Sequence, residues 1–152
     1  AAARQAAELT EDRLVAILIG ALLALSVGVL ATSAGMDRDR SFYPTVTIVI
    51  ASYYALFAVM GGSDEALVIE SLVGAVFIAV AVAGFRSSLW LVVAALLAHG
   101  IFDFVHGTAI ANSGVPIWWP QFCLTYDLTA AGYLAWLLKS ERIRDPHRVP
   151  AS

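Results

Sequence analysis

The sequence predicts an all-α integral membrane protein built as a bundle of five transmembrane helices. Hydrophobic residues make up 60% of the 152 residues and charged residues only 14%, and the mean hydropathy is +0.79, well outside the balance of a soluble domain. The chain contains five long apolar runs, each close to the roughly 20 residues that cross a bilayer core of about 30 Å. Lys and Arg are absent from the interiors of these runs and collect at their ends, as in membrane proteins.

The first predicted helix covers residues 14–35 and follows a polar, amphipathic lead-in at residues 1–13. Its small residues Gly20, Ala24 and Gly28 recur at every fourth position, a spacing that lets two helix backbones approach closely. We therefore expect this helix to serve packing, including contact with a second copy of the chain or with another membrane subunit. The run is too long for the apolar part of a signal peptide.

The second and third predicted helices cover residues 42–61 and 66–84. Pro44 falls in the first turn of the second helix, where proline is tolerated. The turn between the two helices is polar, and Ser63 or Asp64 is a candidate N-cap for the third helix. Both segments are long enough to cross a bilayer.

The fourth and fifth predicted helices cover residues 88–111 and 120–139. They are joined by a loop rich in proline and tryptophan, and Trp118 and Trp119 are expected to lie at the headgroup level of the membrane. Residues 140–152 form a polar tail, whose Asp-Pro and Val-Pro pairs argue against a continued helix.

Five spans place the two termini on opposite sides of the membrane. One side collects two arginines, Arg4 and Arg13. The other side collects the remaining cationic residues, which are Arg38, Arg40, Arg86, Lys139, Arg142, Arg144 and Arg148. The positive-inside rule then predicts a cytoplasmic C-terminus and an outer N-terminus. The sequence has no basic patch of the kind that binds nucleic acid, and the lipid bilayer is its expected surrounding.

The fourth helix carries the most informative motif, His99-x3-Asp103-x2-His106. At 100° per residue, these three side chains fall within an arc of about 60° on one helix face. An ionisable group at the centre of a bilayer is costly, on the order of 2.5–3.5 kcal/mol for Asp, so such residues usually face a protein interior and mark function.

Other polar residues are expected at a similar depth. At 1.5 Å per residue, the polar side chains of four helices lie roughly 8–18 Å below the outer helix ends. We therefore expect one cluster in the outer half of the membrane that contains Glu70, His99, Asp103, His106 and Asp127, with Tyr53, Tyr54 and Tyr126 as candidate hydrogen-bond partners.

These residue types suit two kinds of site. His99, Asp103 and His106 are candidate ligands of a divalent metal such as Zn or Fe, because imidazole and carboxylate at i, i+4 spacing are common donors on one helix. A bound metal would activate a water for hydrolysis, with Glu70 or Asp127 as the general base. We call this the metal hypothesis.

Without a metal, the same groups would form a proton relay or a polar ligand pocket, with Tyr54 and Tyr126 as ligand-binding residues. The alternative is that the cluster only holds the helices together by hydrogen bonds. Glu70 and Asp127 also lie early in their helices, where a carboxylate is favoured by the helix dipole.

Several cofactors do not fit the sequence. No lysine lies within a predicted helix core, because Lys139 is at a helix end, so a retinal Schiff base has no attachment point. A bis-histidine haem is disfavoured, since His99 and His106 share one helix face and His147 lies in the tail. The single cysteine, Cys123, excludes an intrachain disulfide, a cysteine-based zinc site and covalent c-type haem attachment.

Two stretches carry a resemblance to a known family. They are Phe42-Tyr-Pro-Thr45 with the following Ala55–Gly62, and His99-x3-Asp103-x2-His106 with Val115-Pro-x-Trp-Trp-Pro-x-Phe-Cys-x2-Tyr-Asp127. Over about residues 40–138 the chain resembles a family of small multi-pass bacterial membrane proteins of unknown function. This resemblance implies a multi-pass protein of the bacterial inner membrane and brings no assigned activity.

The His-x3-Asp element is also similar to one motif of the membrane hydrolase superfamily that contains the alkaline ceramidases, whose members hold zinc with histidines. This chain departs from that superfamily in three ways: it has five predicted helices instead of seven, no His-x3-His partner motif, and only two intramembrane histidines. We transfer no catalytic role from it.

The sequence thus leads to three hypotheses and does not decide whether the protein is an enzyme. The first is a membrane protein whose outer-leaflet His/Asp/Glu site binds a metal or a small polar or amphiphilic ligand, with metal-assisted hydrolysis of a lipid-like substrate as its enzymatic form. The second is a non-catalytic accessory subunit of a larger membrane complex, joined through the first helix. The third is a proton-coupled carrier, for which five helices per protomer would require oligomerisation.

Overall fold

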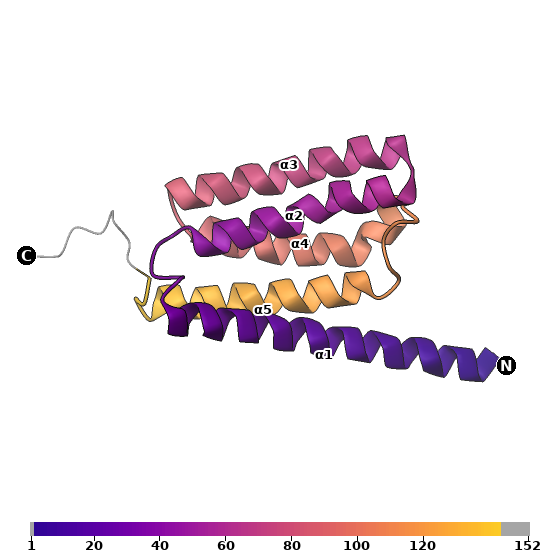
Figure 1. Ribbon diagram of the computed structural model, residues 1–152, viewed down its shortest axis with the longest axis horizontal. Coiled ribbons are helices and arrows are strands. Elements are labelled where there is room, and N and C mark those ends of the chain that lie inside the picture. Colours follow the sequence, from indigo (N-terminus) through magenta and orange to yellow (C-terminus); the bar gives the residue numbers. More distant parts are fainter. Residues whose placement is uncertain (1, 144–152) are drawn as a thin grey trace, which may run out of the picture.

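The computed structural model describes residues 2–143, apart from the side chains of residues 2–7, 9 and 108. Most of the predicted polar tail, residues 144–152 with Arg144, His147 and Arg148, lies outside the described residues. Within them the chain is all-helical (Figure 1). The five helices are α1 (Ala2–Ala34), α2 (Phe42–Gly61), α3 (Asp64–Arg86), α4 (Trp90–Ala109) and α5 (Trp119–Lys139).

The helix bounds follow the hydropathy of the sequence closely. The second helix has the predicted bounds, and the other helix ends differ by at most two residues except at the start of the first helix. There α1 begins at Ala2, because the lead-in is rich in alanine and glutamate, which favour a helix in water as well as in lipid. The lead-in and the first apolar run are therefore one continuous helix.

Within the described residues, four helices are long and apolar enough to cross a membrane. They are Thr10–Ala34 of α1, all of α2 and α3, and Trp90–Gly107 of α4. The fifth helix is not among them, since Gln121, Asp127 and Lys139 lower its hydropathy. It packs against α1 on one side and α4 on the other, so it needs less apolar surface than its neighbours.

The helices form a bundle in which sequence neighbours run antiparallel (Figure 1). The third helix packs against α2 and α4, and α5 packs against α4 and α1. The start of α1 and the end of α5 lie at opposite ends of the bundle (Figure 1). This arrangement agrees with an odd number of crossings.

The small residues of α1 pack within the chain. Gly20, Ala24 and Gly28 are buried and face α5, so that a Cβ at Gly20 would lie 2.4 Å from the carbonyl oxygen of Phe122 and a Cβ at Gly28 would lie 2.9 Å from the ring of Tyr133. The predicted packing role is thus met by α5. A second subunit would have to contact the opposite face of α1.

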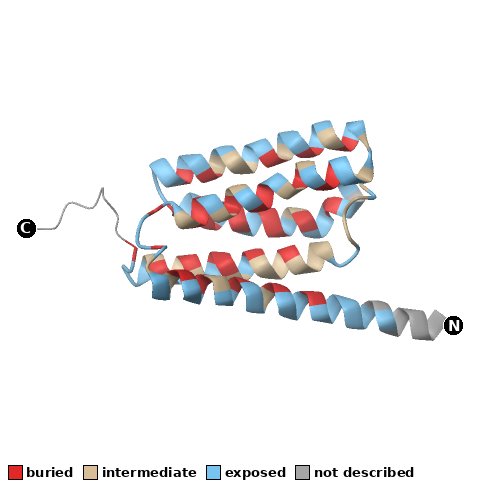
Figure 2. Cartoon of the chain, in the orientation of Figure 1, coloured by how far each residue is buried: buried red, intermediate tan, exposed pale blue. Residues whose placement is uncertain are grey.

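The outward faces of the bundle consist largely of exposed residues (Figure 2), many of which are large and apolar. The most exposed of them on α1 and α3 have 61–65% of their surface accessible: Leu18, Leu22, Leu30, Val68, Leu72 and Val76. A soluble monomer rarely shows an apolar surface of this extent. The faces suit contact with lipid.

The apolar core fills one half of the bundle. It is centred on α4 and α5, where Val92, Leu96, Leu134 and Leu137 are fully buried. These residues lie towards the end of the bundle that holds the α1–α2 and α3–α4 connections (Figure 1). The other half of the interior is therefore left to the polar residues of the candidate site.

Both ends of α3 are capped by side chains. The Ser63 hydroxyl accepts a hydrogen bond from the backbone N–H of Ala66, which confirms Ser63 as the N-cap. At the other end, the buried Arg40 side chain donates to the carbonyl oxygens of Gly84, Phe85 and Ser87 at 2.7–3.2 Å. Arg40 thus satisfies carbonyls that have no partner inside the helix.

Candidate functional site

The fourth helix presents His99, Asp103 and His106 on one face, as the spacing predicts. Each is buried, with 2–4% of its surface exposed. The three side chains do not point to one neighbour. His99 and His106 are seven residues apart, which is about 10 Å along the helix axis, and each imidazole is hydrogen-bonded to a carboxylate of a different helix.

The outer part of the cluster joins α3, α4 and the following loop. His106 Nε2 lies 2.9 Å from Glu70 Oε1, and the Asn112 side-chain amide donates to the same oxygen at 2.8 Å. The Asn112 side-chain oxygen in turn accepts from the backbone N–H of Gly114 at 2.8 Å. Glu70 is completely buried and ties the loop to the bundle.

The close approach of this loop depends on two glycines. A Cβ at Gly114 would meet the backbone of Phe57 and Gly61, and a Cβ at Gly61 would lie 2.4 Å from the Asn112 side-chain oxygen. Because neither residue has a side chain, the loop can lie directly on the end of α2 and hold Asn112 above Glu70.

The inner part of the cluster joins α4 and α5. His99 Nδ1 lies 2.8 Å from Asp127 Oδ2 and 3.8 Å from Asp103 Oδ2. Asp127 is completely buried. This imidazole therefore lies between two carboxylates, one from its own helix and one from α5.

Tyr54 connects the two parts from α2. Its hydroxyl donates to Asp103 Oδ1 at 2.6 Å. The centre of its ring lies 5.0 Å from that of His99 and 6.0 Å from that of His106. Four helices thus meet in one polar cluster, which we call the His/Asp/Glu cluster: Tyr54, Glu70, His99, Asp103, His106 and Asp127.

Four residues of this cluster each keep one buried polar atom without a hydrogen-bond partner among the described residues. The atoms are Glu70 Oε2, His99 Nε2, Asp103 Oδ2 and Asp127 Oδ1. A buried polar atom left unpaired costs about 1–3 kcal/mol, so several of them at one place indicate a site that is completed by a water, a proton or a ligand.

The metal hypothesis is not supported by the arrangement of these donors. In the part of the chain that the structure describes, no three His, Cys, Asp or Glu side chains are arranged to hold a metal ion. The candidate ligands have separate hydrogen-bond partners: His99 is paired with Asp127, His106 with Glu70 and Asp103 with the Tyr54 hydroxyl, so both candidate bases are already partners of the imidazoles. Metal binding would require both pairs to rearrange.

A small cavity lies against the cluster. It is lined by Tyr54, His99, Asp103 and His106 together with apolar and aromatic side chains of α2 and the start of α5. Its volume is about 10 Å³, which is room for about one water-sized group.

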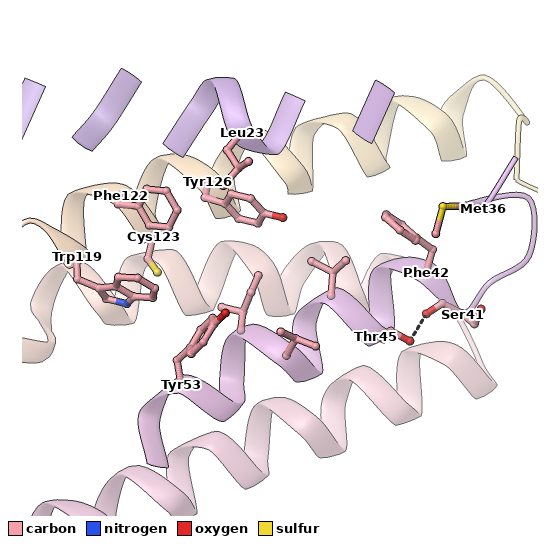
Figure 3. A pocket seen from close by; sticks show the side chains of 13 residues that line it. Leu23, Met36, Ser41, Phe42, Thr45, Tyr53, Trp119, Phe122, Cys123 and Tyr126 are labelled. Carbon is pink, nitrogen blue, oxygen red and sulfur yellow. Dashed lines mark hydrogen bonds between the residues drawn. The ribbon is translucent and has the colours of Figure 1, made fainter. Parts of the chain in front are cut away.

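A much larger groove opens on the side of the bundle, between α2 and α5, with α1 along one edge (Figure 3). We call it the lateral groove, and its volume is about 680 Å³, within the range of small-molecule pockets. Its walls are mostly apolar, with Leu23, Val46, Val49, Tyr53, Phe122 and Tyr126 among them. It runs from Trp119 at one end to Met36 and Phe42 at the other (Figure 3).

The groove and the small cavity adjoin each other. Ile50, Tyr53 and Trp119 line both spaces. Cys123 also lines the groove, and its thiol lies close enough to Asp103 to interact with it. One end of the apolar groove therefore meets the polar cluster.

The two candidate ligand-binding tyrosines have different positions. Tyr54 belongs to the cluster, whereas Tyr126 lines the groove, where its ring stacks near Phe122 and its hydroxyl has no hydrogen bond to the described residues. Tyr53, the third tyrosine, packs edge-on against Trp119. Tyr126 thus belongs to the lateral groove alone among the two spaces, whereas Tyr53 borders both the groove and the small cavity.

Two contributing residues were missed by the sequence analysis. Asn112 was treated as part of a loop, although it lies just beyond the end of α4 and reaches Glu70. Cys123 was considered only for the disulfide and cofactor sites that a single cysteine excludes, although it lies one helical turn before Asp127 and so shares its face. Helical spacing alone was enough to find Cys123.

Comparisons with known proteins add nothing to these observations. No protein-family model matches the chain, and no curated protein or solved structure shows significant similarity to it.

Proposed function

We propose that all five helices cross the membrane, with the start of α1 outside and the end of α5 in the cytoplasm of a bacterial cell. The four apolar helices support this, as does the position of α5 between α1 and α4. Arg38, Arg40, Arg86 and Lys139 are at one end of the bundle and Arg13 lies towards the other, which fits the positive-inside rule. The His/Asp/Glu cluster then lies in the outer half of the membrane.

The protein binds an amphiphilic ligand, whose apolar chain occupies the lateral groove and whose polar head reaches the His/Asp/Glu cluster. The observation that carries this proposal is the contact between the two spaces through Ile50, Tyr53 and Trp119. An apolar groove that ends at buried, unpaired polar atoms matches a molecule with one apolar and one polar end.

The two parts of the site contribute differently to binding. A hydrocarbon chain gains little by leaving lipid for an apolar groove, since both surroundings are apolar. The groove therefore selects the shape and length of the chain. The cluster selects the head, because a buried site built for hydrogen bonds rejects a molecule that leaves its polar groups unpaired.

The test uses 3-bromododecan-1-ol, whose bromine lies close to the hydroxyl head and quenches tryptophan fluorescence at close range. The protein retains Trp119 as its only tryptophan, with Trp90, Trp118 and Trp136 replaced by phenylalanine. We expect saturable quenching, because Trp119 lies at the end of the groove. Val49→Phe, which places a larger side chain in the groove, should weaken the apparent affinity by about tenfold, or about 1.4 kcal/mol.

Val59→Phe is the matched control. Val59 lies on the same helix, is 64% exposed and does not line the lateral groove, so this variant should bind like the parent. Quenching that rises without saturation, or that is equal in Val49→Phe and Val59→Phe, would show that the probe only partitions into the detergent micelle and would contradict the proposal.

Proton-coupled transport is a second candidate. It is favoured by the contact of Tyr54 with both the His99 and His106 rings, which links three carboxylates and two imidazoles in one hydrogen-bonded and stacked cluster. In proteoliposomes that carry a pH gradient, this candidate predicts proton uptake that is lost in Asp103→Asn and unaffected by a metal chelator. Equal proton flux in the parent and in Asp103→Asn would exclude it.

A further inference from the structure

The chemical class of the ligand head can be inferred from the charge of the cluster. Carboxylates outnumber imidazoles by three to two, with Glu70, Asp103 and Asp127 against His99 and His106. Among the described residues, no lysine or arginine is paired with these carboxylates. With its carboxylates ionised, the cluster thus keeps at least one negative charge even when both imidazoles are protonated.

The unpaired atoms also specify hydrogen-bond direction. Asp103 Oδ2 and His99 Nε2 have no partner among the described residues, and both residues border the small cavity. An ionised carboxylate only accepts hydrogen bonds, so the His99 Nδ1–H donates to an ionised Asp127 and Nε2 of the neutral imidazole is then also an acceptor. Asp103 is only 4% exposed and lines the small cavity. A head that satisfies these two atoms must donate, so with Asp103 ionised both charge and hydrogen bonding disfavour an anionic head such as a phosphate or carboxylate.

The size of the small cavity further limits which ligand head can bind there. Its volume of about 10 Å³ admits about one water-sized group. A primary ammonium is of this size, carries one positive charge and has three N–H donors. A quaternary ammonium has the same charge but is larger and has no N–H.

The lateral groove provides no competing site for an anion. The residues that line it carry no charged side chain, and its polar atoms come from tyrosine, serine, threonine and cysteine. The ligand site is therefore uncharged along the lateral groove and acidic at the His/Asp/Glu cluster.

We propose that the natural ligand is an aliphatic primary amine, whose ammonium group enters the small cavity beside Asp103 and whose chain lies in the lateral groove. This proposal rests on the proposed function and adds the class of the head. It applies equally to a simple long-chain amine and to a larger lipid whose primary amine is next to the chain.

The test compares four unlabelled competitors that share one chain: dodecylamine, dodecyltrimethylammonium, dodecanol and dodecyl phosphate. Each competes with 3-bromododecan-1-ol for the protein that retains Trp119 as its only tryptophan, with Trp119 fluorescence as the readout at pH 7. We expect dodecylamine to displace the probe at a concentration at least tenfold below that of dodecanol. Dodecyltrimethylammonium should be no better than dodecanol, and dodecyl phosphate should be worse.

The four competitors separate the two proposals on this single-tryptophan protein, without any change to the His/Asp/Glu cluster. If none of them displaces a saturably bound probe, or the probe does not bind saturably, the proposed function fails. If all compete but dodecyl phosphate or dodecyltrimethylammonium equals dodecylamine, only the ammonium assignment fails. As a second readout, Asp103→Asn should reduce the ratio of dodecylamine to dodecanol affinity, since it replaces an unpaired acceptor with a donor; an unchanged ratio would overturn the assignment of the head to Asp103.

Discussion

The contact between α1 and α5 makes a prediction whose size can be worked out from the structure. A Cβ at Gly20 would lie 2.4 Å from both the Phe122 carbonyl oxygen and the Thr125 hydroxyl oxygen. The carbonyl belongs to the backbone and cannot rotate away. To restore an ordinary contact of at least 3.4 Å, the two helices must separate by about 1 Å, and overpacking of this kind costs about 1–3 kcal/mol.

Gly132→Ala is the matched control, because it makes the same chemical change where the added Cβ meets nothing within 4 Å. Replacing glycine by alanine inside a helix stabilises it by about 0.5–1 kcal/mol. We expect Gly132→Ala to raise the free energy of unfolding by about that amount, and Gly20→Ala to lower it by about 1–2 kcal/mol after the same gain is included.

The free energy of unfolding is measured by SDS titration in mixed micelles, with helicity followed by circular dichroism. The two variants should differ by about 2 kcal/mol and with opposite signs relative to the wild type. If Gly20→Ala is as stable as Gly132→Ala, α1 does not pack on α5 as described. Leu23 of α1 would then not line the lateral groove.

Three further predictions concern the caps, the cluster and metal content. Arg40→Ala should lower the free energy of unfolding by about 2–4 kcal/mol, because it removes charged hydrogen bonds to the end of α3, whereas exposed Arg38→Ala should change it by less than about 0.5 kcal/mol; equal effects would refute the cap. Tyr54→Phe should cost about 1–3 kcal/mol by leaving Asp103 Oδ1 unpaired, measured in the same titration, and a neutral result would show that this hydrogen bond is absent. Elemental mass spectrometry of the purified protein should find Zn and Fe well below one atom per chain, and near-stoichiometric metal would restore the metal hypothesis.

The helices could be predicted from the sequence because hydropathy depends on composition and not on the arrangement of neighbours. The second helix has the predicted bounds. The fifth helix, viewed alone, is less apolar than a typical membrane helix because it contains Gln121 and Asp127. Packing against other helices compensates for these polar residues, and the sequence does not reveal that packing. Its role in the bundle became clear only from its contacts with α1 and α4.

The composition of the polar cluster could also be predicted, because helical spacing and distance from the helix ends fix which side chains share a face and a depth. The pairing could not. The distance from a helix end gives the depth of a side chain but not the rotation of its helix about its axis. Nothing in the sequence therefore showed that His106 would be hydrogen-bonded to Glu70 and His99 to Asp127. The metal hypothesis assumed that residues of one helix face share one ligand.

The lateral groove was not foreseen at all. It exists because α2 and α5 stand apart, although α4 packs against both of them. Such a separation depends on side-chain volumes across three helices. The apolar residues that line it, such as Val46 and Val49, look like ordinary lipid-facing residues in the sequence.

The most direct test of the central claim is to locate a bound amphiphile along the groove. A dodecylamine that carries a photoreactive diazirine at the far end of its chain should label residues near Met36, Phe42 and Thr45, whereas a diazirine next to the amine should label residues near Tyr53 and Cys123, as read by peptide mass spectrometry. This shift of labelling with diazirine position follows from a head at the His/Asp/Glu cluster and a chain in the lateral groove. Labelling that is spread over the outward faces of α1 and α3, or that does not change with the position of the diazirine, would contradict the account.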